Sequence, residues 1–205
     1  MKKSHHFIKK SFYALFASIT LIGSFILNSG PNSPNSFNQI TYAKKTKKAK
    51  KVKKVPHRRW NKAKASIYLD LGKNDDLIAV TNDAIKEWNE TGAFTFTKTK
   101  NRKKAQITVV PWYNSETRYA GYTHWRYYVK SHRLVASTIQ LNTYYLCDFA
   151  DDAERYQQVL QAIEHELGHA MGLDHNTKVP SVMDTEGRYP IQPVDVKNVK
   201  KLYRK

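Results

Sequence analysis

His165–His175 reads HELGHAMGLDH, a stretch in which three histidines, one glutamate and one glycine stand at the offsets H-E-x-x-H-x-x-G-x-x-H. Residues four apart lie on one face of an α-helix, so a helix here would present the imidazoles of His165 and His169 side by side. Gly172 suits the left-handed conformation that ends helices, and a chain that turns there can bring His175 back towards the other two. The stretch therefore predicts a helix, a sharp turn and a cluster of three imidazoles.

Three imidazoles that meet at one point are a ligand set of catalytic zinc sites, in which water takes the fourth tetrahedral position. Zinc lowers the pKa of that water. Glu166 lies one step round the helix from His165, where its carboxylate can reach the water without binding the metal, so we expect Glu166 to be the general base. The alternative is an ordinary helix with surface histidines, which does not explain Gly172 and His175 at their offsets.

This motif resembles that of the metzincin zinc endopeptidases, and a second family feature follows it. The sequence continues with Ser181-Val182-Met183, in which Met183 comes eight residues after His175. In metzincins a methionine in this place forms the Met-turn, an apolar floor beneath the metal site. The motif and the interval are most similar to those of the matrixins. The resemblance implies a zinc-dependent endopeptidase of proteins or peptides, with His165, His169 and His175 as the zinc ligands.

The segment from Trp60 to Lys205 carries signals for strands and helices in the order that matrixin catalytic domains use. Alternating, β-branched and aromatic residues predict five strands, and apolar residues at helical intervals predict three helices. The strands are expected at Ser66–Leu71, Phe94–Thr97, Ala105–Val110, Ala120–Thr123 and Ser137–Asn142, and the helices at Asp75–Glu90, Asp152–Met171 and Val194–Tyr203. We therefore expect an α+β fold, a metzincin/matrixin-like catalytic domain with a twisted five-stranded mixed sheet and three helices.

Residues 1–59 differ in composition from the rest of the 205-residue chain, because they hold 14 of its 35 Lys and Arg residues and none of its 17 Asp and Glu residues. Met1–Lys10 is basic, Ser11–Leu27 is apolar and uncharged, and Thr41-Tyr42-Ala43 has the small first and third residues of a signal-peptidase site. We expect residues 1–43 to be an export signal that resembles Gram-positive bacterial signals. The apolar run is close to the shortest membrane span, so an uncleaved N-terminal anchor is the alternative.

Lys44–Arg59 (KKTKKAKKVKKVPHRR) is dense in positive charge, which predicts a disordered linker before a zinc metallopeptidase domain at residues 60–205. In an exported protein such a run can bind anionic cell-wall polymers or lipid head groups, and a plain solvated linker is the alternative. Most of the net charge of +18 lies in residues 1–59. We expect a monomer that is secreted, associated with the cell wall or membrane, and without a nucleic-acid partner, because the export signal argues against one.

Cys147 is the one cysteine of the chain, so no intrachain disulfide is expected. Many matrixins are kept latent by a propeptide cysteine that occupies the fourth position of the zinc, and residues 1–59 contain no cysteine. Cys147 comes just before the motif helix. We interpret it as a small buried hydrophobe.

Two further groups of residues are candidates for metal binding. His124 and His132 fall in the region where animal matrixins bind a second, structural zinc, but no matching aspartate accompanies them and we expect both to lie at the surface. Asp148, Asp151 and Asp152 could bind calcium through carboxylate oxygens. Helix capping explains these aspartates more simply, because Asp favours the first turn of a helix.

Three functions fit these residues. The first is a secreted zinc-dependent endopeptidase, in which an extended peptide pairs with an edge strand near Ala120–Tyr122 and Glu166 activates the zinc-bound water. The second is a cell-envelope binding protein with a vestigial metal site, and the third is a zinc hydrolase that acts on peptidoglycan. Glu166 favours an enzyme, because a site kept for structure needs ligands but no base. We therefore predict the endopeptidase.

Overall fold

The computed structural model describes residues 57–204, and five strands in this part of the chain form one sheet in the order β2-β1-β3-β5-β4. β1 pairs in parallel with β2 and β3, β3 pairs in parallel with β5, and β4 is antiparallel to β5 at the edge. The predicted mixed sheet of an α+β fold is confirmed. The strands are β1 (Lys64–Leu69), β2 (Thr95–Lys98), β3 (Ile107–Trp112), β4 (Gly121–Tyr127) and β5 (Leu134–Asn142).

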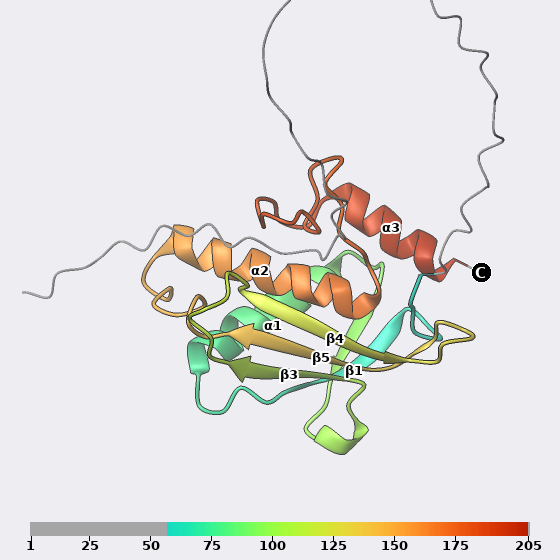
Figure 1. Ribbon diagram of the computed structural model, residues 1–205, viewed down its shortest axis with the longest axis horizontal. Coiled ribbons are helices and arrows are strands. Elements are labelled where there is room, and N and C mark those ends of the chain that lie inside the picture. Colours follow the sequence, from blue (N-terminus) through green and yellow to red (C-terminus); the bar gives the residue numbers. More distant parts are fainter. Residues whose placement is uncertain (1–56, 205) are drawn as a thin grey trace, which may run out of the picture. The chain divides into compact units, whose positions relative to one another are not determined.

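Three α-helices occur within residues 57–204, as the sequence predicts: α1 (Asp75–Glu90), α2 (Ala153–Met171) and α3 (Pro193–Tyr203), with one 3-10 turn, η1 (Arg102–Lys104). α1 and α2 contact each other, and they also contact the sheet, α1 at β2 and α2 at β4 and β5 (Figure 1). The indole nitrogen of Trp88 on α1 donates to the carbonyl oxygen of Glu164 on α2 at 2.9 Å. This arrangement places α2 beside the β4 edge of the sheet.

The core between helices and sheet comes from the apolar faces that the sequence pattern predicts. On α1, Leu77, Val80, Ala84 and Trp88 recur at helical spacing and are fully buried. Asn74 is the N-cap of this helix, and its side chain accepts a hydrogen bond from the backbone nitrogen of Leu77 at 2.9 Å. Burial of such side chains is the main favourable contribution to folding, and it fixes α1 against α2.

β4 and β5 extend beyond their predicted bounds, β4 to Tyr127 and β5 back to Leu134. After Thr123 the β4 side chains are exposed or half-buried on both faces, so alternation of polar and apolar residues could not reveal the strand. Pairing with β5 maintains it instead, with a register shift between Arg126 and Tyr127. Strand pairing thus overrides the local pattern in this hairpin.

The predicted export signal and most of the lysine-rich run lie outside the described residues. The described chain begins at His57, and Arg59 already contacts the folded part: its backbone nitrogen donates to His132 O at 3.2 Å, and its carbonyl oxygen accepts from Leu134 N at 2.8 Å. Contacts with the domain therefore start before Trp60. Among the described helices, none is long and apolar enough to cross a membrane.

Candidate metal centre

α2 carries the first half of the motif and ends at the predicted glycine. Its N-cap is Asp152, whose side chain accepts from the backbone nitrogen of Arg155 at 3.0 Å. At the other end Gly172 has φ +103°, a conformation that side-chain-bearing residues rarely adopt. The nitrogen of Leu173 then donates to the carbonyl oxygen of Gly168 at 3.0 Å. The chain therefore leaves the helix at Gly172 and turns back towards α2.

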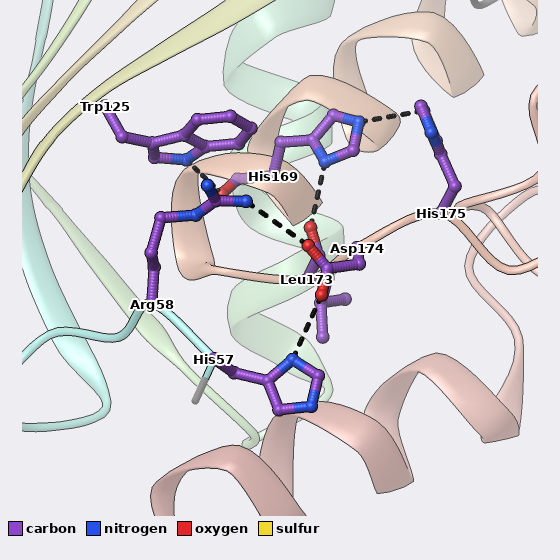
Figure 2. Close-up of polar contacts among 7 residues, drawn as sticks. All are labelled: His57, Arg58, Trp125, His169, Leu173, Asp174 and His175. Carbon is purple, nitrogen blue, oxygen red and sulfur yellow. Dashed lines mark hydrogen bonds and ion pairs between the residues drawn. The ribbon is translucent and has the colours of Figure 1, made fainter. Parts of the chain in front are cut away.

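This turn brings the three motif histidines together, as the spacing predicts. Their ring centroids are separated by 4.7 Å for His165 and His169, 5.2 Å for His165 and His175, and 4.7 Å for His169 and His175. One ring nitrogen from each lies within 4.8 Å of the others, and Figure 2 shows His169 and His175 facing each other. Within residues 57–204, no other group of three His, Cys, Asp or Glu residues meets this geometry.

Hydrogen bonds orient two of the rings. Nδ1 of His165 lies 2.7 Å from the carbonyl oxygen of Val182, and Nδ1 of His169 lies 2.9 Å from that of Leu173. A carbonyl can only accept, so each Nδ1 carries a proton and donates, which leaves Nε2 as the nitrogen with a lone pair. Backbone partners of this kind fix the tautomer and the orientation of metal-binding histidines.

The surroundings keep these imidazoles neutral. Burial, followed by the neighbouring histidines, holds the pKa of His165 well below its ordinary value. Burial and the proximity of His175 lower the pKa of His169 to about 4. The pKa of His175 is also lowered by burial, although Asp174 and Asp184 oppose the shift. Three neutral imidazoles are a donor set that fits a zinc ion, since a protonated ring cannot bind a metal.

Glu166 lies on α2 directly after His165 and is fixed by two residues of β4. Its Oε2 accepts a hydrogen bond from the Thr123 hydroxyl at 2.5 Å. A Cβ atom on Gly121 would come within 2.6 Å of its Cγ, so only glycine leaves room for the side chain there. Burial raises the pKa of Glu166 to about 7, and the hydrogen bond from Thr123 works against that shift. The carboxyl group can therefore gain or lose a proton near neutral pH.

The segment that resembles a Met-turn packs against the motif helix. Met183 is buried, and a Cβ atom on Gly168 would lie 2.3 Å from its sulfur, so the methionine occupies the space that this glycine leaves. The preceding residue, Val182, supplies the carbonyl that orients His165. The methionine thus contributes packing, and its neighbour contributes a hydrogen bond to the histidine cluster.

Comparison with known families agrees with this geometry. The family model described as Matrixin matches residues 59–204. The chain belongs to the matrixin family. Membership and the histidine cluster together identify a zinc metallopeptidase of the metzincin type, with three histidines positioned to bind a metal.

One solved structure similar to this matrixin is archaemetzincin from Methanopyrus kandleri. The two are 14% identical, and the match covers 75% of this chain and 99% of the archaemetzincin chain with a TM-score of 0.48. No curated protein matches this matrixin.

Several residues that support the histidine cluster of this matrixin were missed by sequence reasoning. The carbonyl oxygens at the end of α2 accept hydrogen bonds from three distant side chains: His169 O from Trp125 Nε1 at 2.8 Å, Ala170 O from Trp60 Nε1 at 2.9 Å, and Met171 O from the Tyr203 hydroxyl at 2.7 Å. These carbonyls belong to the last turn of the helix, where the regular helical partner four residues on is missing. Buried Trp and Tyr side chains generally need a polar partner, which is the one signal that the sequence offered.

Asp195 is a second kind of residue that the sequence did not reveal. It is fully buried, and its Oδ2 accepts from the nitrogens of Val182 at 2.8 Å and Gln192 at 2.9 Å. The Ser181 hydroxyl donates to its other oxygen. An acid near the start of a helix is ordinarily explained by capping alone. Here it also holds the Met-turn, and through Val182 it supports His165.

The two histidines outside the motif do not join the cluster. His124 is exposed, as predicted, and its Nε2 lies 2.7 Å from the side-chain oxygen of Gln140. His132 is half-buried rather than at the surface, and its ring stacks on Tyr127 with the centroids 6.0 Å apart. The turn between β4 and β5 brings the two rings together, and this contact covers part of His132.

Two other predictions about the loop before α2 have different outcomes. Cys147 is half-buried instead of buried, with its sulfur 3.5 Å from the carbonyl oxygen of Tyr144. Capping is confirmed for Asp152, the N-cap of α2. Asp148 and Asp151 are exposed, and calcium binding by these aspartates stays a prediction.

Proposed function

We propose that this matrixin is an endopeptidase in which His165, His169 and His175 bind the zinc ion and Glu166 is the general base. One observation carries the proposal: the residue after the first of three clustered imidazoles is a buried glutamate, whose carboxyl group Thr123 holds by a hydrogen bond. Burial also raises the pKa of this glutamate to about 7. A group that serves as a base works best when its pKa lies near the working pH.

The residues of the chain divide the chemistry between them. Bound zinc would polarise the scissile carbonyl and lower the pKa of a water molecule. Glu166 takes a proton from the attacking water and passes it to the nitrogen of the leaving amine. Thr123 holds Oε2 of that carboxylate, and Gly121 leaves room for its methylene groups, so the base enters the reaction in one orientation.

The substrate is proposed to bind along β4. This strand forms an edge of the sheet, and its side chains Thr123 and Trp125 contact the motif helix at Glu166 and His169. An extended peptide can add to an exposed strand edge through main-chain hydrogen bonds, which accept many side-chain sequences. A protein or peptide is therefore the substrate that this edge favours.

The fixed base argues against the vestigial site of an envelope-binding protein. Burying a carboxyl group costs free energy, and a site retained for structure alone gains nothing from Glu166 or from the contacts that Thr123 and Gly121 make with it. A peptidoglycan hydrolase would use the same zinc ligands and the same base. Substrate choice therefore separates it from the endopeptidase.

The test is cleavage of a diverse peptide pool by the purified 205-residue chain, with mass spectrometry as the readout. We expect internal cleavage that disappears when a chelator removes the metal and returns when one equivalent of zinc is added. Cleavage that persists in the metal-free chain would contradict the zinc mechanism. Cleavage of peptidoglycan cross-links with no cleavage of linear peptides would favour the hydrolase.

Thr123→Val should shift the acid limb of the pH profile of kcat/KM upwards by about one unit. A hydrogen bond to a charged group contributes about 1.5–3 kcal/mol, and one pKa unit corresponds to about 1.4 kcal/mol. The Thr123 hydroxyl stabilises the ionised form of Glu166, so its loss raises the pKa and the base is protonated over a wider acid range. Thr97→Val, at an exposed position of β2, is the control. An unchanged limb in Thr123→Val would show that Glu166 does not set the profile.

We further propose that the enzyme is exported and that its lysine-rich run binds anionic wall polymers. The support is the charge of residues 44–56 and the apolar run before them. Salt shortens the Debye length from about 10 Å at 0.1 M to about 3 Å at 1 M, so retention on isolated walls should fall with salt. A chain without residues 44–56 should be retained poorly at both concentrations. Equal retention of the two chains would show that the run is a linker.

A further inference from the structure

The described chain begins with a short segment, residues 57–60, that lies against the turn carrying the third histidine; we call it the strap. Two of its side chains bind one carboxylate of that turn. Nδ1 of His57 lies 3.0 Å from Oδ2 of Asp174, and the Arg58 guanidinium donates to Oδ1 at 3.3 Å (Figure 2). Asp174 is the residue immediately before His175.

Arg58 also connects the strap to the motif helix, through Trp125 of β4. Its guanidinium carbon lies 4.2 Å from the ring centroid of Trp125, within the range of a cation–π contact. The indole nitrogen of the same tryptophan donates to the carbonyl oxygen of His169. Figure 2 shows Arg58 between Trp125 and Asp174, so one side chain touches both the turn and the tryptophan that binds the helix end.

The backbone of the strap approaches the turn as closely as the side chains do. A Cβ atom on Gly172 would lie 2.0 Å from the carbonyl oxygen of Arg58. Gly172 is thus constrained twice, by its positive φ and by the chain that passes over it. Farther along the strap, the buried Trp60 donates to Ala170 O. The strap therefore lies against the end of α2 and the turn that follows it, from Ala170 to Asp174.

The position of Asp174 gives these contacts a consequence for the metal site. The residue before it, Leu173, supplies the carbonyl that orients His169, and the residue after it is a member of the histidine cluster. Residues 173–175 belong to no helix or strand. Fixing the Asp174 carboxylate therefore restrains both the hydrogen bond to His169 and the placement of His175.

We propose that His57 and Arg58 are positioning residues for the metal centre, which hold Asp174 and thereby the turn that carries the third histidine. The inference rests on the proposed zinc site. It gives the two residues a role in metal affinity although they belong, by sequence, to the lysine-rich run. A cut of the chain before His57 would keep these contacts, whereas a cut after Arg59 would remove them.

The test is the dissociation constant of zinc for the 205-residue chain, measured by competition with a chromogenic chelator. We expect Arg58→Ala, Asp174→Ala and the double variant each to weaken zinc binding by about tenfold, at the lower end of the range for residues that support metal ligands. The double variant should weaken binding by less than the product of the two single effects, because the Arg58–Asp174 contact is lost in both singles. The visible spectrum of the cobalt-substituted chain reports ligand geometry, so it should also differ between the wild-type chain and these variants.

Arg59→Ala is the matched control. Arg59 is the next residue of the strap, but its guanidinium donates to Leu202 O on α3 and not to the turn that carries the third histidine. It should leave the zinc dissociation constant and the cobalt spectrum unchanged. Melting temperatures of the metal-free chains separate a loss of metal affinity from a general loss of stability. Arg58→Gln takes the place of Arg58→Ala if that variant fails to fold.

A zinc dissociation constant within twofold of the wild-type value in Arg58→Ala or Arg58→Gln would overturn the inference, as would an equal loss in Arg59→Ala. The measurement needs no substrate, so its outcome is separable from that of the proposed activity. A chain that binds zinc tightly but cuts no peptide contradicts the peptidase and leaves the positioning role to be decided by the affinities. A wild-type chain that binds no zinc contradicts both.

Discussion

Glu166→Gln should lower kcat for peptide hydrolysis by about 10²- to 10⁴-fold and leave zinc bound, because that range is typical of general acid–base catalysis. Glutamine has nearly the shape of glutamate, so it fits beside Gly121, and its carbonyl oxygen can still accept a hydrogen bond from the Thr123 hydroxyl. It cannot take a proton from water. Steady-state cleavage of one peptide from the pool, with zinc content measured on the same sample, checks both parts.

The chain offers a matched control two residues earlier on the same helix. Glu164 is fully buried, and burial together with Glu87 raises its pKa well above the ordinary value, which favours the protonated carboxyl group that an amide imitates. Glu164→Gln should therefore keep both zinc and activity. Wild-type turnover in Glu166→Gln would exclude Glu166 as the base. A similar loss in both variants would indicate damage to α2 instead.

The sequence predicted the part of the site that one helix and one turn encode. His165, His169 and His175 meet because their offsets are set by helix geometry and by a single left-handed glycine, and both properties are local. Bounds were predicted well where a cap or an apolar stripe marks them, as in α1, whose ends at Asp75 and Glu90 agree with prediction.

The supporting residues could not be predicted, because they reach the site through tertiary packing. Thr123 contacts Glu166 from the edge strand, and Trp60 reaches the end of α2 from the start of the domain. In the sequence each looks like an ordinary strand or core residue. Arg58 was hidden in another way, since a basic residue within a lysine-rich run is normally explained as solvated charge.

The same limit explains why Gly121 escaped notice although it is part of the site. A glycine in a strand usually marks a bulge or a close approach, but the sequence does not say what approaches. The structure shows that the approaching group is Glu166. Residues that leave space for a catalytic group are therefore harder to find than residues that bind a metal, because their contribution is the absence of atoms.

His175→Ala should abolish both zinc retention and peptide hydrolysis, because it reduces the ligand set from three imidazoles to the two on α2. Loss of a residue that merely supports a ligand costs about 10- to 100-fold in metal affinity, and loss of the ligand itself should exceed that. The matched controls are His124→Ala and His132→Ala, which remove imidazoles outside the cluster and should keep one zinc per chain. Metal analysis after dialysis, alongside cleavage of the same peptide, provides the measurement. Full zinc content in His175→Ala would mean that His165 and His169 bind the metal with some other third group, and that the turn after Gly172 serves only to end the helix.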